Sequence, residues 1–327
     1  MNRRRYVLIA LAGALVSPLR VSAQPAGKVY RVGVLLITSR AHPTTARILQ
    51  PFEQGLREAG YVEGKNLVIE WRGAEGHYER LPTLAGELVA RKVDVIVAGA
   101  DAAAIAARNA TRAIPIVFVA ATDPIGQGPV KNFARPEGNV TGFATLGEAA
   151  VGKRLELFRE VLPNITRLAA IHDPESDRRG IAALREATAK LNMQLRQHEV
   201  RSEADLDRAF RAIEQERPEG LAVAASVIAY LNRKRVAEFA AEQRLPSMFS
   251  FAEFVEAGGL MSYSFNYSDN YRRAVAYVDK ILKGAKPADL PVQQPMTLEL
   301  VVKLKTARQI GVKIPHSILL RADRVIE

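Results

Sequence analysis

The chain of 327 residues is 48% hydrophobic and 25% charged, which is typical of a globular protein and excludes disordered, collagen-like and disulfide-stabilised classes. It contains no cysteine, so disulfides, thiolate metal sites, a cysteine nucleophile and a lipidated cysteine anchor are excluded. The formal charge of +11 would indicate nucleic acid or an anionic surface if the basic residues were clustered, but beyond Arg3–Arg5 they alternate with Asp and Glu, as on solvated helix faces.

The N-terminal segment has the pattern of an export signal. Arg3–Arg5 precede an apolar stretch, Tyr6–Val16, that is shorter than the roughly 20 residues a transmembrane helix needs. Val21–Ala23 offers small residues to a signal peptidase, so we expect residues 1–23 to be a signal peptide cleaved near Ala23, before Gln24. The arginines also partly match a twin-arginine signal, which leaves the export route open. A soluble exported protein without a lipid anchor is retained best in the periplasm of a double-membraned bacterium.

Strands and helices are predicted to alternate from residue 28 to residue 142. The run Tyr30–Ile37 is short, apolar and β-branched, as in a strand buried on both faces. Pro43–Ala59 has helical spacing of its apolar residues, and Gly60 stands where a C-cap is expected. The further elements expected here are strands at 66–71, 93–97 and 114–120 and helices at 78–91 and 102–111. Four strands with three helices predict a parallel, doubly wound sheet with right-handed crossovers.

A second series of the same kind is predicted after Asn139–Gly142. Its expected helices are 148–162, 178–191, 203–216 and 231–243, and its expected strands are 167–172, 194–200, 221–225 and 247–251. The ending differs, with a strand at 259–265, a helix at 270–283, a proline-containing segment at 285–295 and a tail carrying 298–304 and 318–320. The fold class is therefore α/β, in two tandem lobes.

Motifs for catalysis, cofactors and metals are missing from the sequence. The histidines are too scattered for HExxH or a local metal pair: His42, His77, His172, His198 and His316. There is no GxSxG elbow, no Walker A loop and no complete GxGxxG, so we predict a protein that is not an enzyme and has no cofactor. Aromatic residues make up only 6% of the chain, which argues against a nucleic-acid surface.

Small polar residues gather at the carboxyl ends of the predicted strands, where ligands bind in open α/β sheets. Those of the first lobe are Thr38, Ser39, His42, Ala100, Asp101, Thr122 and Asp123, and those of the second lobe are His172, Ser226 and Ser250. If the carboxyl ends of the strands in the two lobes face each other, these residues would form a cleft between the lobes. The same residue types also cap helices where no ligand is present, so each has this alternative role.

Several stretches resemble a known family. They are IPIVF at 114–118, DPIG at 123–126, ARPEGNVTG at 134–142, GGLMSY at 258–263, ILKGAKPADLP at 281–291 and ADRVIE at 322–327. The chain resembles, over nearly its whole mature length, the ABC transporter substrate-binding proteins related to the TrpX group, which have the type I periplasmic binding protein fold. Two further residues complete the candidate ligand-binding set: Thr145 and Tyr263.

The resemblance implies two doubly wound parallel-sheet lobes joined by a three-crossing hinge. The crossings are expected near Thr141–Thr145, Phe251–Glu256 and Ala285–Pro291. The first lobe would then hold 28–142 plus 252–285, and the second would hold 143–251 plus 286–327. Such a protein closes like a Venus flytrap on a small polar organic molecule, here an amino acid or a related compound, aromatic ones included. Its partners are the permease and ATPase subunits of an ABC importer in the inner membrane.

One position departs from the family pattern. Relatives carry a Thr or Ser after the Gly-Gly that follows the third strand, whereas this chain has Gly99-Ala100-Asp101-Ala102. A hydroxyl there suits a ligand carboxylate, but an aspartate would repel one, so Asp101 either caps a helix beginning near Ala102 or pairs with an ammonium group.

Other functions remain as alternatives. A two-lobe receptor can serve a chemoreceptor or kinase as its ligand-sensing partner in place of a transporter. An exported α/β enzyme would need Ser226 or Ser250 to meet His172 and Asp173. A cytoplasmic sugar-responsive repressor shares the two-lobe core. It is disfavoured because the N-terminus has the pattern of an export signal and not of a helix-turn-helix.

Overall fold

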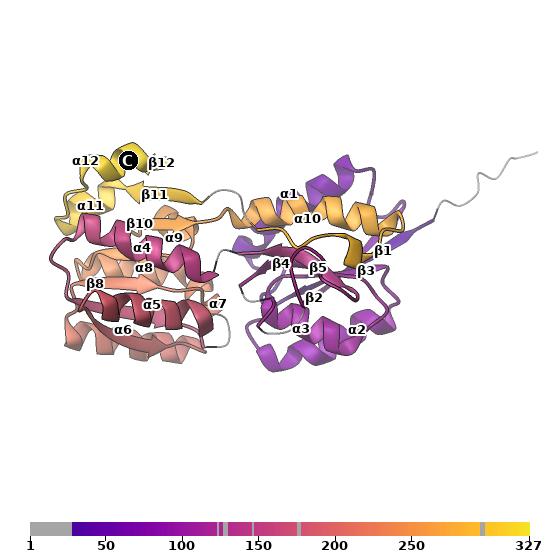
Figure 1. The fold of residues 1–327 in the computed structure, drawn as a ribbon, viewed down its shortest axis with the longest axis horizontal. Coiled ribbons are helices and arrows are strands. Elements are labelled where there is room, and N and C mark those ends of the chain that lie inside the picture. Colours follow the sequence, from indigo (N-terminus) through magenta and orange to yellow (C-terminus); the bar gives the residue numbers. More distant parts are fainter. Residues whose placement is uncertain (1–27, 123, 127–129, 146, 175–177, 295–297) are drawn as a thin grey trace, which may run out of the picture.

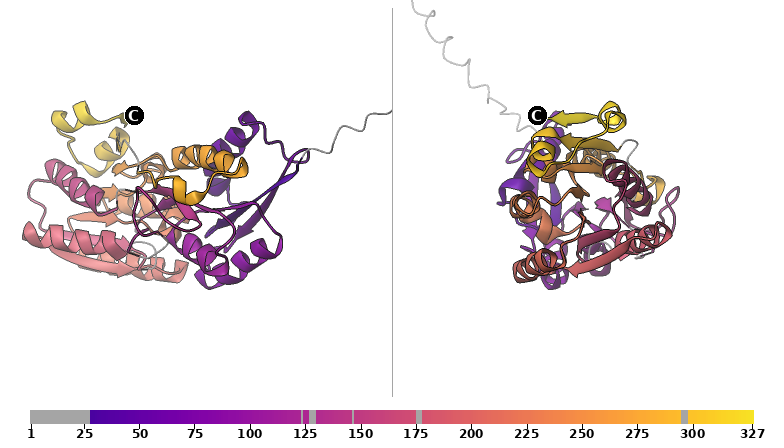
Figure 2. Two further views of the ribbon diagram at one scale, coloured as in Figure 1. Left: turned by 45° about the vertical axis from the view of Figure 1, so that its right-hand side comes forward. Right: turned by 90° about the vertical axis from the view of Figure 1, so that its left-hand side faces the viewer.

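The computed structural model describes residues 28–327 except 123, 127–129, 146, 175–177 and 295–297, and it describes 147–149 by their backbone alone. These residues form two α/β lobes that follow each other along the long axis of the molecule (Figure 1). Viewed along that axis, one lobe lies in front of the other (Figure 2). None of the described helices is long and apolar enough to cross a membrane.

The first lobe is built on a parallel sheet of five strands in the order β2-β1-β3-β4-β5. The strands are β1 (Tyr30–Leu36), β2 (Leu67–Gly73), β3 (Val95–Ala98), β4 (Ile116–Ala121) and β5 (Val140–Ala144). Helices α1 (Pro43–Glu58) and α10 (Tyr267–Leu282) share one apolar cluster with the sheet, and α2 (Leu81–Ala90) and α3 (Asp101–Ala110) share the other. Short 3-10 turns lie at Tyr78–Arg80 and Pro287–Asp289. Strands β3, β4 and β5 are buried at every residue, as expected for strands covered on both faces.

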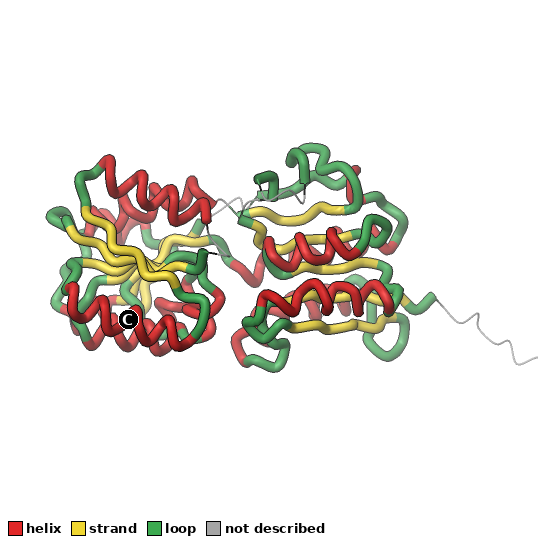
Figure 3. The backbone as a smooth tube through the Cα atoms, turned by 90° about the horizontal axis from the view of Figure 1, so that it is seen from below, coloured by secondary structure: helices red, strands yellow, loops and turns green. Residues whose placement is uncertain are grey.

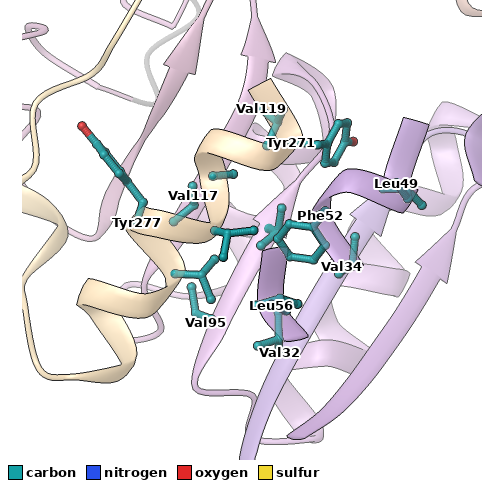
Figure 4. Packing of buried hydrophobic residues seen from close by; sticks show 14 of the residues in the cluster. Val32, Val34, Leu49, Phe52, Leu56, Val95, Val117, Val119, Tyr271 and Tyr277 are labelled. Atoms are coloured by element: carbon teal, nitrogen blue, oxygen red, sulfur yellow. The ribbon is translucent and has the colours of Figure 1, made fainter. Parts of the chain in front are cut away.

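Helix α1 shows how the sequence positions the elements of this lobe. The His42 Nδ1 accepts a hydrogen bond from the Thr44 backbone N at 3.3 Å and so caps the helix. Phe52 and Leu56, spaced by four residues, lie on its buried stripe. Figure 4 shows both side chains packed on the sheet, Leu56 beside Val32 and Phe52 in the middle of the cluster, where its ring meets Tyr271 of α10 edge-on at 6.4 Å. A segment from the end of the chain therefore completes the core of the first lobe.

The second lobe has a mixed sheet of seven strands in the order β12-β11-β10-β9-β8-β6-β7. The strands are β6 (Arg167–His172), β7 (Gln194–Glu199), β8 (Gly220–Val223), β9 (Ser247–Phe249), β10 (Met261–Ser264), β11 (Glu299–Lys303) and β12 (Arg324–Ile326). The helices are α4 (Gly147–Val161), α5 (Arg178–Lys190), α6 (Glu203–Glu216), α7 (Val227–Leu231), α8 (Arg233–Glu242), α9 (Ala252–Glu256), α11 (Leu304–Ile310) and α12 (His316–Arg321).

The helices of the second lobe cover both faces of this sheet (Figure 3). In β6, Leu168 and Ala170 belong to the apolar cluster of α4, α5, α11 and α12, whereas Ala169 and Ile171 belong to that of α6, α7, α8 and α9. Alternate residues of a strand point to opposite faces, so the two clusters lie on opposite sides. Strand β11 runs antiparallel to β10, which corrects the expectation that the sheet is wholly parallel.

The predicted alternation of strands and helices is confirmed, but the sequence analysis missed a strand. Val140–Ala144 pairs with β4 as the fifth strand, β5, where a crossing segment was expected. Gly142 makes this pairing possible, because its φ is 150° and a Cβ atom there would lie 2.1 Å from the Phe118 backbone O. A glycine inside an otherwise apolar strand conceals the strand from pattern analysis.

The expected lobe boundaries also need correction. Helix α9 packs in the second lobe, and β10 pairs with β9 and β11, so 252–264 belong to the second lobe and not to the first. Conversely, Leu290 and Val292 are buried in the first lobe, and the Ala144 N donates to the Gln293 O at 2.8 Å. Residues 286–293 therefore belong to the first lobe.

The three crossings consequently lie elsewhere than predicted. The chain passes between the lobes from Ala144 to Gly147, from Ser264 to Tyr267 and from Gln293 to Glu299. The segments expected to cross are occupied by β5, by α9 and by the 3-10 turn at Pro287–Asp289. Each of these elements is held within one lobe by its own hydrogen bonds and burial, which leaves the connections between elements to join the lobes.

Candidate functional site

A cavity of about 150 Å³ lies between the lobes. Its walls include the loops that follow β1, β3, β4 and β5 of the first lobe and β8 and β9 of the second. This is the edge of an α/β sheet where ligands are expected, because the carboxyl ends of parallel strands converge there. Seven of the residues predicted from the sequence line it: Thr38, Ala100, Asp101, Thr122, Thr145, Ser226 and Ser250.

Four other predicted residues stand apart from the cavity. His42 caps α1, and the Ser39 Oγ accepts from the Ala41 backbone N at 3.3 Å. His172 is buried at the end of β6. Tyr263 contributes its backbone O, which accepts from the Arg154 Nε at 2.8 Å, and so it positions an arginine that does line the cavity. Asp123 lies outside the described residues.

Asp101 is held at the cavity by hydrogen bonds to the neighbouring loop. It is only 3% exposed, and its Oδ2 accepts from the backbone N of Thr122 at 2.7 Å and from its Oγ1 at 2.6 Å. Helix α3 begins at Asp101 itself and Ala100 is its N-cap residue, so the alternative of Asp101 as the cap of a helix beginning near Ala102 is wrong. A negative charge in the first turn is favoured by the helix dipole.

The second lobe contributes two hydroxyls and a guanidinium. The Ser226 Oγ accepts from the Ala229 backbone N at 3.2 Å and caps α7, and the Ser250 Oγ donates to the Val223 O at 3.0 Å. Arg154 projects from α4, with its Nε fixed by Tyr263. The polar groups of this lobe are thus oriented by the protein itself, as a preformed binding site requires.

The sequence analysis missed an aromatic wall made of Tyr230, Phe251, Phe265, Tyr267 and Tyr271, all of which line the cavity. Ring centroids lie 5.3 Å apart for Tyr230 and Phe251, 5.9 Å for Phe251 and Tyr267, and 5.7 Å for Tyr267 and Tyr271. A signal for it was present: Tyr267 and Tyr271 are four residues apart on one helix face, and Phe265 directly follows β10. The sequence analysis gave these aromatic positions no role beyond their strands and helices.

The described lining of the cavity combines neutral phenols with two charged side chains. Burial is the main cause that raises the pKa of Tyr230, Tyr267 and Tyr271 above the ordinary value of 10.0, so these phenols are neutral near neutral pH. The Tyr267 hydroxyl donates to the Gly99 O at 2.7 Å. Among the described residues of the lining, the charged ones are Asp101 from the first lobe and Arg154 from the second. The cavity therefore presents one negative and one positive group, from different lobes.

The lobes touch each other around the cavity. The Tyr78 hydroxyl of the first lobe donates to the Asp173 Oδ2 of the second at 2.9 Å, and Arg47 pairs with Glu256 at 3.2 Å. Helix α7 of the second lobe packs on the first, because Val227 and Tyr230 contact the two apolar clusters there. The chain is thus in a closed arrangement.

The serine–histidine arrangement that an exported enzyme would need is not formed by the described residues. Neither ring nitrogen of His172 has a hydrogen-bond partner among the described residues, so the histidine does not meet Ser226 or Ser250. Burial is the main cause that lowers its pKa below 6.5. No group of three or more His, Asp or Glu side chains in the described part of the chain is placed to hold a metal ion.

Comparison with known proteins identifies the family. The model of the family called ABC transporter substrate binding protein matches residues 31–326. The chain belongs to this family. Its two-lobe architecture is the type I periplasmic binding protein fold, as the sequence motifs indicated.

Two solved structures and one curated relative show how close the similarity is. A conserved domain protein from Vibrio cholerae is 30% identical, with 91% of this chain and all of that chain covered and a TM-score of 0.84. The ABC domain from Streptococcus pneumonia in complex with L-Trp is 28% identical at the same coverage, with a TM-score of 0.83. A tyrosine-binding protein from Clostridioides difficile is 24% identical over 274 residues, 83% of this chain and 79% of the relative.

Proposed function

We propose that this substrate-binding protein is an exported receptor for an α-amino acid with an aromatic side chain. The observation that carries the proposal is the placement of Asp101 and Arg154 on different lobes of one cavity whose remaining wall is rich in aromatic rings. An amino acid carries an ammonium group for the first and a carboxylate for the second, and charge-assisted hydrogen bonds to such groups are the strong ones. The ligands named for two relatives, L-Trp and tyrosine, have this chemistry.

Ligand binding would then be coupled to closure of the lobes. A ligand that holds Asp101 and Arg154 together contacts both lobes only in the closed arrangement, so its differential affinity shifts the population towards that form. The hinge motion is expected where the chain passes between the lobes, and of these connections the one at 264–267 is described in full. The closed form is the one that a membrane permease distinguishes from the open one.

We propose that this receptor lies in the periplasm and delivers its ligand to the permease and ATPase subunits of an ABC importer. The export signal at 1–23 and the family support this placement. Mature protein recovered from periplasm should begin near Gln24, and an intact Met1 on cytosolic protein would contradict it. A ligand-sensing role beside a chemoreceptor or kinase predicts instead that deleting the gene leaves uptake of the ligand unchanged.

The ligand is tested by calorimetric titration with L-tyrosine, L-tryptophan and L-phenylalanine. Two analogues of tyrosine complete the set: tyramine, which lacks the carboxylate, and 3-(4-hydroxyphenyl)propionate, which lacks the ammonium group. Because each analogue lacks one of the two charged groups that Asp101 and Arg154 would bind, both should bind at least about tenfold more weakly than the parent amino acid. Equal binding of an analogue and its parent, or binding of none of the amino acids, would contradict the proposal.

A further inference from the structure

The hydroxyl of Tyr230 is a buried polar atom in the wall of the cavity. It has no hydrogen-bond partner of regular geometry among the described residues. The tyrosine ring is held edge-on by Phe251 at 5.3 Å and by Phe254 at 6.1 Å, and the Arg233 guanidinium lies 5.7 Å from its centroid. A buried phenol is costly unless its hydroxyl is hydrogen-bonded, and a hydroxyl that donates to the Glu253 side chain can still accept a hydrogen bond from a second partner.

Glu253 is the acidic group that acts most strongly on this hydroxyl, through its charge and through a side-chain hydrogen bond. After burial, its negative charge is the next largest cause that raises the pKa of Tyr230, and burial raises the pKa of Glu253 itself. Tyr230 is therefore a neutral phenol near neutral pH, able both to donate and to accept a hydrogen bond. Glu253 does not line the cavity, whereas Tyr230 does, so a molecule in the cavity meets the phenol first.

In this closed arrangement Tyr230 bridges the two lobes. It belongs to α7 of the second lobe, yet its ring packs against the apolar cluster around α1 and α10 of the first lobe. Because Tyr230 lines the cavity from a helix of the second lobe, it would contact the part of the ligand that faces that lobe. The aromatic neighbours of Tyr230 are suited to a ring, and the charges of an amino acid are assigned to Asp101 and Arg154.

We infer that Tyr230 is a specificity-determining residue, whose hydroxyl binds a polar group carried on the aromatic ring of the ligand. This inference rests on the proposed function. The phenol hydroxyl of tyrosine and the indole N–H of tryptophan are such groups, and phenylalanine has none. A site built to hydrogen-bond a ligand hydroxyl rejects the analogue that lacks it, because its own buried polar atom is then left without a partner.

The test uses matched ligand pairs that differ in one polar atom. L-Tyrosine is compared with L-phenylalanine, and L-tryptophan with β-(3-benzothienyl)-L-alanine, in which sulfur replaces the indole N–H. For at least one pair, wild-type protein should bind the polar member about tenfold more tightly or better, in line with a buried hydrogen bond. In Tyr230→Phe that ratio should fall towards one, as measured by calorimetric titration.

Tyr277→Phe is the control variant. It removes the hydroxyl of a tyrosine outside the cavity, which donates to the Pro291 O at 2.6 Å, and it should keep the wild-type ratio. The inference is overturned if wild-type protein discriminates neither pair, or if the discrimination survives in Tyr230→Phe, in which case Glu253 or another group serves the ligand. If wild-type protein binds no aromatic amino acid, the proposed function fails and this inference fails with it. Since the first outcome needs wild-type protein alone, misfolding of the variant does not prevent a decision.

Discussion

The carboxylate of Asp101 and the backbone and side chain of Thr122 join two loops of the first lobe at the cavity. One carboxylate oxygen accepts both hydrogen bonds, from the Thr122 N at 2.7 Å and from its Oγ1 at 2.6 Å. These bonds fix the position of the carboxylate at the start of α3. A fixed negative charge at the start of a helix favours a cation as the ligand group. The hydroxyl that is common at this place in the family favours an anion instead.

Asp101→Asn should weaken the binding of aromatic amino acids. The amide oxygen can still accept from Thr122, so the fold should be kept, but the negative charge that we propose for the ligand ammonium group is lost. We expect the affinity to fall about ten- to a hundredfold, since a charge-assisted buried hydrogen bond contributes roughly 1.5–3 kcal/mol. The affinity of 3-(4-hydroxyphenyl)propionate should rise, because the variant no longer repels a lone anion. Calorimetric titration measures both.

Asp94→Asn is the matched control for this change. Asp94 also belongs to the first lobe and accepts from the Arg31 backbone N at 2.7 Å, but it does not line the cavity. Its substitution should leave ligand affinity within error of wild type. Equal affinities of Asp101→Asn and wild type would remove Asp101 from the site and assign it to joining the loops alone.

Arg154→Gln should show the complementary pattern. Loss of the guanidinium removes the partner of the ligand carboxylate, so we expect amino-acid affinity to fall about tenfold or more while tyramine, which has no carboxylate, is little affected. Lys153→Gln removes a positive charge one residue away on the same helix, and its side chain pairs with Glu156 on the surface. That control should bind both ligands as wild type does. A parallel loss of both ligands in Arg154→Gln would indicate structural damage through Tyr263 and not a lost contact.

The sequence pointed to polar residues that line the cavity and missed the aromatic ones, for a physical reason. Residues such as Thr38 and Ser226 follow strands, and the topology of α/β sheets alone brings strand ends together. Phe251 and Tyr267 reach the cavity through the pairing of β9 and β10 and the return of α10 to the first lobe. Those are long-range contacts, and in a sequence an apolar ring beside a cavity has the same pattern as one inside a core.

The lobe boundaries depended on similar long-range information. The sequence of β10 is compatible with a strand of either sheet. Only its hydrogen bonds with β9 and β11 place it in the sheet of the second lobe. The segment around Leu290 was expected to cross between lobes because of its prolines. Tertiary contacts override that signal, since the Leu290 O accepts from the Thr141 Oγ1 at 2.6 Å and its side chain is buried in the first lobe.

His172 should make the stability of the protein depend on pH. Burial lowers its pKa below 6.5, so the unfolded chain binds the proton at a higher pH than the folded protein does. The free energy of unfolding should therefore be highest above about pH 6.5 and fall as the pH drops below that value, by up to roughly 1.4 kcal/mol per pH unit from this group. Urea denaturation of wild type and His172→Gln between pH 5 and 7.5 measures the slope.

His316→Gln controls for the loss of a histidine at an exposed position. The slope below pH 6.5 should be smaller in His172→Gln than in wild type and in His316→Gln. Identical slopes in all three proteins would mean that His172 takes its proton as readily in the folded state as in the unfolded one.

The hydrogen bond from Tyr78 to Asp173 should contribute to closure itself. It joins the two lobes at 2.9 Å, so Tyr78→Phe should favour the open form and weaken all ligands by a common factor of about ten, leaving the tyrosine-to-phenylalanine ratio as in wild type. Tyr61→Phe breaks a Tyr–Asp hydrogen bond of the same length, to Asp279, within the first lobe, and should change no affinity. Titration gives the factors, and solution scattering should show a more extended ligand-free Tyr78→Phe protein. An unchanged affinity in Tyr78→Phe would show that closure does not depend on this contact.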